Sequence, residues 1–168
     1  MTKKSEKESF SCIGCRAKRL ISAREIIEEF ALAGYSAQPV RASVVFGPEH
    51  AASACLHAIR SVGRGETSSH DIGTVIAMYL GCNRQISKAL AAVGIDGEKE
   101  IVIITVPASD GPEAEKVLER LGMERDDSLM GIDKGKLKNA SLLGIESPDP
   151  ETVKEAVLER VALVDLDL

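Results

Sequence analysis

Polar side chains gather at the start of an amphipathic stretch in residues 81–94, in a pattern that suits binding rather than catalysis. We expect Asn83 to cap a helix there, with Arg84 and Lys88 projecting from one face because they lie four residues apart. The opposite, buried face is predicted to carry Ile86, Ala89, Leu90 and Val93. Free amides and the helix dipole attract anions at such an end, so the segment predicts a phosphate-binding surface. A solvated polar face is the alternative.

The sequence lacks the motifs that usually carry hydrolysis, phosphoryl transfer or dinucleotide binding. It contains no GxSxG elbow, no Walker phosphate loop, no HExxH and no GxGxxG. His50, His57 and His70 lack the spacing of a metal site, and we interpret them as structural or surface residues. Asp126 and Asp127 are adjacent carboxylates that we interpret as solvated. We therefore expect no enzyme activity, no metal and no cofactor.

Four cysteines raise the question of redox chemistry. Cys12 and Cys15 form the one CxxC motif, whereas Cys55 and Cys82 stand alone, so the paired spacing of a structural zinc site is missing. We do not expect disulfides in a chain with a core of this size. A thiol-redox function of Cys12 and Cys15 is one alternative; the other is a first strand in which the two side chains face opposite sides.

Composition and charge limit the function further. At 168 residues with 44% hydrophobic content, the chain is long enough for one domain with a proper core. The net charge of −5 is uneven, because residues 1–99 contain 13 Lys and Arg against 10 Asp and Glu, and residues 100–168 contain 8 against 16. Any nucleic-acid contact is therefore expected in the first hundred residues.

Two kinds of segment are missing from the chain. No stretch approaches the roughly 18 apolar residues of a membrane span, and no apolar signal region follows the first lysines, so we expect a cytoplasmic protein without membrane contact. Aromatic residues make up only 3% of the chain, which is too few for a platform that stacks several bases. A nucleic-acid ligand would then be a short single-stranded end.

The hydrophobic pattern predicts a layered fold. Strands are expected at residues 10–15, 40–46, 101–106 and 128–132. Six helices are expected, at residues 22–34, 48–62, 67–80 (starting at 67, 68 or 69), 83–93, 112–121 and 150–164, and a weak one after Lys134. In the first of them, Ile27 and Leu32 are expected on the buried side. We predict one α/β domain over residues 10–168, a small mixed sheet covered by a layer of helices, after a disordered lead-in at residues 1–9.

Several segments together resemble the kinase-binding subunit of the KEOPS complex, of the archaeal type. The resemblance extends over about residues 10–166, and its most specific part is Arg84, Gln85 and Ile86 within residues 81–94. The other matching segments are residues 43–45, 56–59, 89–90 and 159–164. The charged lead-in and the CxxC are not family features.

This resemblance implies an adaptor rather than an enzyme. It implies docking on the N-lobe of the small kinase/ATPase subunit of KEOPS, with the other subunits reached indirectly. It also implies binding of the single-stranded CCA end of tRNA, in support of threonylcarbamoyladenosine formation. A protein-interaction module without RNA binding is a further alternative.

The resemblance also assigns residues. Arg84 would meet phosphate and Gln85 a base edge or ribose hydroxyl, with the other candidates at Asn83, Lys88, His57, Arg60 and Arg64. Asn83 and Lys88 enter by helix geometry, His57 by its matching segment, and Arg60 and Arg64 by charge. Kinase binding falls on the C-terminal helix, through whichever of these residues the fold leaves uncovered: Val157, Leu158, Val161, Leu163 and Val164.

Overall fold

The computed structural model describes residues 9–67 and 71–166, and four of its segments form one sheet. The strand order is β2-β3-β1-β4, and every pairing is antiparallel. The strands are β1 (Ser11–Ala17), β2 (Ser36–Arg41), β3 (Glu100–Val106) and β4 (Met123–Arg125). The predicted α/β class is confirmed, but the sheet is antiparallel rather than mixed.

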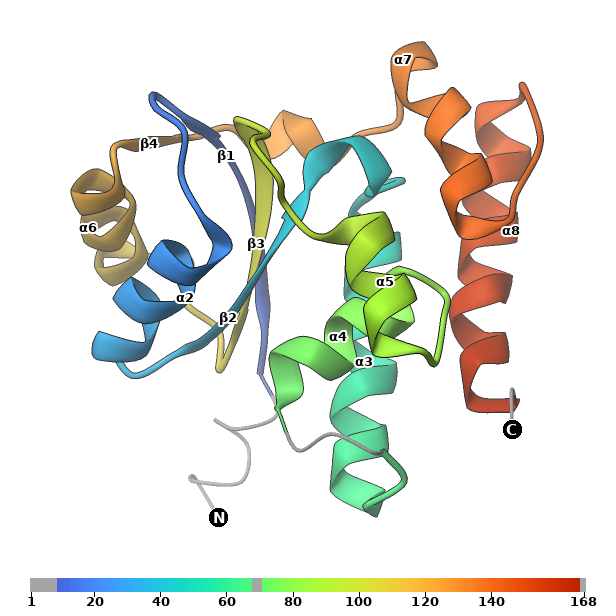
Figure 1. Cartoon of the computed structure of the whole chain (residues 1–168), viewed down its shortest axis with the longest axis horizontal. Helices are drawn as coiled ribbons and strands as arrows, with labels where there is room; N and C mark the ends of the chain where they lie inside the picture. Colours follow the sequence, from blue (N-terminus) through green and yellow to red (C-terminus); the bar gives the residue numbers. More distant parts are fainter. Residues whose placement is uncertain (1–8, 68–70, 167–168) are drawn as a thin grey trace.

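Helices cover both faces of the sheet (Figure 1). The α-helices are α2 (Ala23–Leu32), α3 (Pro48–Arg64), α4 (Ile72–Leu80), α5 (Ile86–Val93), α6 (Pro112–Leu121), α7 (Lys134–Leu137) and α8 (Pro150–Leu163). Short 3-10 turns lie at η1 (Ala42–Val44), η2 (Asp127–Met130), η3 (Lys138–Leu143) and η4 (Val164–Leu166). Helices α2 and α6 lie on one side, α3 to α5 lie on the other, and α8 packs outside α3.

Strand β3 explains this arrangement because it is apolar on both faces, as the sequence predicts. Ile101 and Ile103 belong to the core beneath α2 and α6, whereas Val102 and Ile104 belong to the core beneath α3 and α4. Alternation along a strand sends successive side chains to opposite faces. A central strand of this kind needs a helical layer on each side.

The two cysteines of the CxxC motif lie on opposite faces of the sheet. In β1, Cys12 is paired with Ile104 and packs toward the α3 side, while Cys15 is paired with Ile101 and lies in the other core. Burial, with a smaller contribution from Asp127, raises the pKa of Cys15 to about 12, so its reactive thiolate is scarce at neutral pH. Their places on opposite faces keep the two thiols apart, so the geometry does not support the thiol-redox alternative.

Most predicted helices are confirmed, including the three that begin with Gly-Pro or Asp-Pro. Pro48 and Pro150 occupy the first turns of α3 and α8, and Asp149 caps α8 by accepting from the Thr152 amide at 3.0 Å. Valines at helical spacing form the buried side of α8 and of the turn that follows it: Val153, Val157, Val161 and Val164. In α2 the prediction is partly wrong, because Ile27 is 38% exposed and Leu32 is 83% exposed.

Two predicted strands are wrong, and so is the start predicted for α4. The chain leaves the sheet after Arg41, and residues 42–44 form the turn η1. Residues 128–130 lie in η2 instead of a strand, and the strand of this region lies earlier, as β4. Helix α4 begins at Ile72 with Asp71 as its cap, rather than at residues 67–69, of which 68 and 69 lie outside the described residues. Of the predicted lead-in, residues 1–8 also lie outside them.

Long-range side chains explain why residues 42–46 form a turn. Lys136 is buried, and its ammonium donates to the carbonyls of Val45, at 3.0 Å, and Leu129. Asn139 donates to the carbonyl of Ser43 at 3.1 Å. These bonds satisfy backbone groups that would otherwise need a neighbouring strand. Within the described part of the chain, no helix is long and apolar enough to cross a membrane.

His50 joins the start of α3 to two neighbouring segments. Its Nδ1 accepts from the Phe46 amide at 3.1 Å, so the proton is on Nε2, which donates to the Leu80 carbonyl at 3.0 Å. Burial lowers the pKa of His50 to about 4, with a smaller contribution from the positive charge of Lys136. The ring is therefore a neutral structural strut, as the sequence interpretation holds.

Stability should depend on pH through His50. The unfolded chain takes up a proton on this ring below about pH 6.5, and the folded chain does so only near pH 4. The stabilisation is complete above pH 6.5 and is lost as the pH falls toward 4. Between pH 7 and pH 5 we expect the free energy of unfolding to fall about 2 kcal/mol further in the natural protein than in His50→Gln, measured by urea denaturation. Equal pH slopes would contradict this, and NMR titration of the ring reads its pKa directly if the variant does not fold.

Candidate functional site

The connection between α4 and α5 fixes where the predicted binding residues emerge. Cys82 adopts a left-handed conformation with φ of 54°, and its amide donates to the Tyr79 carbonyl at 3.1 Å. The Asn83 amide donates to Met78 at 3.0 Å, which closes the end of α4. A Cβ on Gly81 would meet the backbone of Ala89 at 3.2 Å, so the two helices approach closely there.

Asn83 lies in the turn before α5 and is not the cap of that helix, contrary to the sequence prediction. Its Oδ1 accepts from the Gln85 amide at 2.8 Å, and Gln85, without a side-chain hydrogen bond, is the residue that precedes α5. Asn83 therefore shapes the turn rather than caps the helix. Arg84 lies in this turn, outside α5, so it does not share a helical face with Lys88 as predicted. Gln85 and Lys88 are exposed and Arg84 is half-buried.

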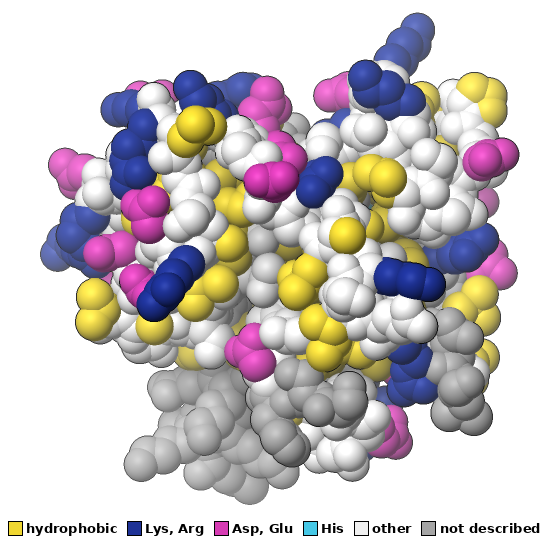
Figure 2. Space-filling model, in the orientation of Figure 1, with side chains coloured by type: hydrophobic (Ala, Val, Ile, Leu, Met, Phe, Trp, Pro, Cys, Tyr) yellow, Lys and Arg dark blue, Asp and Glu magenta, His cyan; other side chains and the backbone are white. Residues whose placement is uncertain are grey.

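The buried stripe of α5 is narrower than predicted. Ala89 and Val93 are fully buried, whereas Ile86 is partly buried and Leu90 lies at the surface. The space-filling view shows hydrophobic side chains over α5 interspersed with Lys and Arg (Figure 2). The amphipathic pattern thus locates the helix correctly but overstates how much of it the core covers.

Arg84 packs toward the C-terminal half of α3. It lines a cavity of about 290 Å³ together with Ser61, Glu66, Thr67, Met78, Tyr79 and Val164. Its charge is close enough to Tyr79 to oppose the rise in the pKa of that hydroxyl, which burial and a hydrogen bond to Asp165 produce. The structure therefore brings the α4–α5 turn and α3 together, although they are distant in the sequence.

His57 on α3 contacts the same tyrosine. Its Nδ1 is 2.8 Å from Oδ2 of Asp165, and its ring stacks on Tyr79 with centroids 5.6 Å apart. Tyr79 donates its hydroxyl proton to the other oxygen of Asp165. Burial alone would raise the pKa of Asp165, but these two hydrogen bonds lower it. The sequence analysis missed Tyr79 and Asp165, and no local spacing pointed to either.

The remaining predicted cations lie nearby on α3. Arg60 and Arg64 are both exposed, and Arg64 forms an ion pair with Glu66 at 3.0 Å. Of the predicted RNA residues, Arg84 and His57 both lie near Tyr79, and Glu66, the ion-pair partner of Arg64, lines the same cavity as Arg84. Gln85 and Lys88 lie beyond this cluster, at the start of α5. His70 lies outside the described residues.

This cluster offers charge and hydrogen bonds but lacks an activated nucleophile. The His57 and Asp165 pair resembles the base and orienting acid of a hydrolase, yet no described hydroxyl or thiol is hydrogen-bonded to the second ring nitrogen of His57. Arg84, Arg64 and Arg60 supply positive charge at its rim. Chemically, the arrangement suits an anion such as phosphate better than a covalent reaction.

The predicted kinase residues divide into buried and accessible ones. Val157, Val161 and Val164 are in the core, so a partner could not reach them without opening it. Leu158 is half-buried, and Leu163 is 45% exposed. Leu166, which the sequence analysis missed, is 73% exposed in η4 and lines a second cavity with Leu163, Arg160 and Cys82. The accessible apolar surface is therefore at the C-terminal end of α8.

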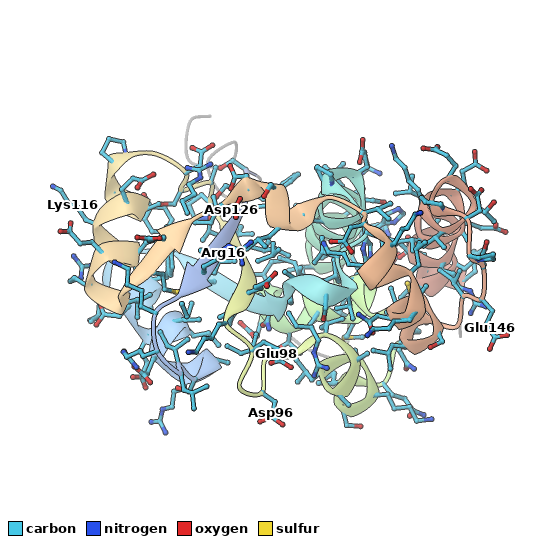
Figure 3. The ribbon with its side chains drawn as sticks, turned by 90° about the horizontal axis from the view of Figure 1, so that it is seen from above. Arg16, Asp96, Glu98, Lys116, Asp126 and Glu146 are labelled. Carbon is cyan, nitrogen blue, oxygen red and sulfur yellow. The ribbon has the colours of Figure 1, made fainter. Side chains whose placement is uncertain are left out.

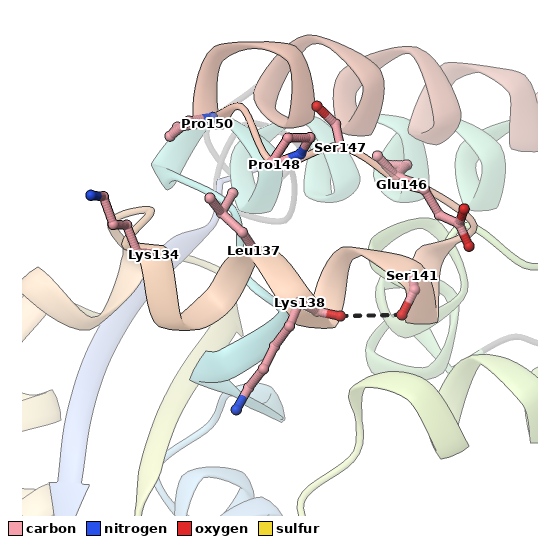
Figure 4. A pocket seen from close by; sticks show the side chains of 9 residues that line it. Lys134, Leu137, Lys138, Ser141, Glu146, Ser147, Pro148 and Pro150 are labelled. Atoms are coloured by element: carbon pink, nitrogen blue, oxygen red, sulfur yellow. Dashed lines mark hydrogen bonds between the residues drawn. The ribbon is translucent and has the colours of Figure 1, made fainter.

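Two other conspicuous features lie away from these residues. The acids at the β1–β4 edge are paired: Asp126 binds Arg16 at 3.0 Å, and Asp127 accepts from the Gly14 amide, also at 3.0 Å (Figure 3). A groove of about 690 Å³ between η3 and the loop before α8 is lined by Leu137, Ile145 and two prolines (Figure 4). It contains none of the predicted binding residues.

The turn made by Asn83 can be tested by stability. Asn83→Ala removes the acceptor for the Gln85 amide, and we expect a loss of about 1 kcal/mol in the free energy of unfolding. Asn83→Asp keeps an oxygen in the same place and should stay within about 0.5 kcal/mol of the natural protein in the same denaturation experiment. Equal losses in both variants would show that the side-chain acceptor does not hold the turn.

The sequence matches a known protein family over most of its length. The family model described as kinase binding protein CGI-121 matches residues 18–165, which covers every α-helix and strands β2, β3 and β4 but begins after β1. The matched region includes both the α4–α5 turn and α8. No curated protein matched the chain.

Proposed function

The chain belongs to the kinase binding protein CGI-121 family, the family of the kinase-binding subunit of the KEOPS complex, and we propose that it acts there as a non-catalytic adaptor. In this proposal it binds the N-lobe of the small kinase/ATPase subunit and the single-stranded CCA end of tRNA. It thereby supports threonylcarbamoyladenosine formation without carrying out the reaction. The family match over residues 18–165 is the observation that carries the proposal.

The C-terminal end of α8 is the proposed kinase surface. Leu163 and Leu166 are exposed there, next to the half-buried Leu158. Leucines that remain exposed close together at the end of a helix supply apolar area that a partner can bury. The buried valines act indirectly, because they hold α8 against α3 and so place these leucines.

The α4–α5 turn is the proposed contact with RNA. Arg84 would bind phosphate, and the exposed side chain of Gln85 would reach a base edge or a 2′-hydroxyl. Asn83 would hold the turn, while Lys88, Arg60, Arg64 and the partly accessible ring of His57 would border the bound strand. The excess of cations in the first 99 residues supports this location.

A crossover experiment tests the two surfaces separately. We expect Arg84→Ala with Lys88→Ala to weaken binding of tRNA and to leave kinase binding intact. Loss of two single-strand phosphate contacts should lower the slope of log affinity against log salt by about 1.4. Leu163→Asp should do the reverse, weakening kinase binding roughly 30-fold as a central apolar contact would.

Matched controls lie on the opposite helical layer. Lys116→Ala on α6 removes an exposed cation, and Leu32→Asp on α2 places a charge on an exposed leucine. Both should leave tRNA and kinase affinities unchanged. If a tRNA trimmed of its CCA binds as well as the intact tRNA, end recognition is wrong. If the Arg84 and Lys88 variant retains full tRNA affinity, the proposed RNA surface is wrong. If neither the natural protein nor the variant binds tRNA, the chain is better described as a protein-interaction module without RNA binding.

A further inference from the structure

The two proposed interfaces meet at one hydrogen-bonded junction. Asp165, in the turn that continues α8, accepts from Tyr79 of α4 and lies 2.8 Å from the ring nitrogen of His57 on α3. His57 in turn stacks on Tyr79. One carboxylate therefore connects three elements: α4, which ends at the α4–α5 turn, α3, which carries Arg60 and Arg64, and the C-terminal turn η4.

The same junction borders residues of both interfaces. Arg84 of the α4–α5 turn and Val164 of the C-terminal segment line one cavity, with Tyr79 between them in the lining. On the other side of Val164, Leu163 and Leu166 line the neighbouring cavity at the surface. A partner that presses on the two leucines thus acts on the residues directly before and after Val164 and Asp165.

The segment that carries Asp165 has few other attachments. The turn η4 spans only Val164–Leu166, and of these residues Val164 alone is in the core while Leu166 is largely exposed. Its position depends on burial of one valine and on the two hydrogen bonds of Asp165. Short 3-10 turns at helix ends are only weakly stabilised by their own backbone bonds. A partner that covers Leu166 would therefore favour the attached position.

The negative charge of Asp165 connects its hydrogen bonds to the residues around Arg84. The Asp165 carboxylate is ionised at neutral pH, because its hydrogen bonds from Tyr79 and His57 outweigh the effect of burial on its pKa, with a smaller contribution from Arg64. In the attached position it fixes the His57 ring and the Tyr79 hydroxyl, and Tyr79 lines the same cavity as Arg84, whose charge acts on that hydroxyl. Holding the binding groups in place before the ligand arrives lowers the entropy cost of binding.

We propose that Asp165 is a positioning residue that couples the two interfaces, so that kinase docking on Leu163 and Leu166 tightens binding of the tRNA end. This inference rests on the proposed function. Coupling of binding equilibria is reciprocal, so tRNA tightens kinase binding by the same factor. In this proposal the bound kinase holds η4 in place, and Asp165 of η4 then holds His57 and Tyr79. Tyr79 lines the cavity that Arg84 also lines, so the surroundings of Arg84 are held as well.

The test measures a ratio of affinities rather than an affinity. The dissociation constant of a tRNA ending in CCA is determined with the full chain alone and with the chain saturated by its kinase partner. We expect the kinase to tighten tRNA binding about fivefold or more in the natural protein. In Asp165→Asn, which keeps the shape but cannot accept from both groups as an anion, the ratio should fall to about one.

Two further variants separate coupling from plain stability. Tyr79→Phe keeps the ring stacked on His57 but removes one hydrogen bond to Asp165, and it should also lower the ratio. Asp149→Asn alters the cap at the other end of the same helix and should leave the ratio unchanged. A merely structural role of Asp165 would weaken both affinities and leave the ratio as in the natural protein.

The outcomes distinguish failure of the coupling from failure of the proposed adaptor function. If the natural protein binds both partners with a ratio of one, or if Asp165→Asn keeps the natural ratio, the coupling is wrong and the adaptor function stands. If the natural protein binds only one of the two partners, or neither, both the adaptor function and the coupling are wrong.

Discussion

The fold depends on one strand that must be buried from both sides. Residues 101–104 of β3 place isoleucines under α2 and α6, and a valine and an isoleucine under α3 and α4. Each face therefore needs its own helical layer, and the layers differ in what else they carry. Helix α3 is packed between the sheet and α8, so its position decides where the α4–α5 turn and the end of α8 reach the surface.

Function follows from this division into layers. The α2 and α6 side closes the core and carries none of the candidate binding residues. The opposite side brings the turn at Asn83 and Arg84 within reach of α3, and it brings the C-terminal turn onto the same helix through His57 and Asp165. Two surfaces that are separate in sequence thus share a wall of side chains, which is an arrangement suited to an adaptor.

The sequence predicted those parts whose stabilising groups are local. Helix α6, α8 with its buried valines, and β3 follow from periodicity, and the cap of α8 comes from the neighbouring Asp149. Residues 42–46 were mispredicted because Lys136 and Asn139, far along the chain, satisfy their carbonyls. Asp165 and Tyr79 could not be found for the same reason, since 86 residues separate them. Arg84 was proposed from its spacing and from the family resemblance, but its place in the turn before α5 was not predicted.

If two partners bind neighbouring segments of one helical layer, hydrogen exchange measured peptide by peptide should locate both contacts. The chain would be compared alone, with its kinase partner, and with a tRNA ending in CCA. We expect slower exchange at residues 158–166 with the kinase, slower exchange at residues 82–88 with the tRNA, and unchanged exchange in α2 and α6. Protection that falls mainly on α2 and α6 with either partner would contradict it.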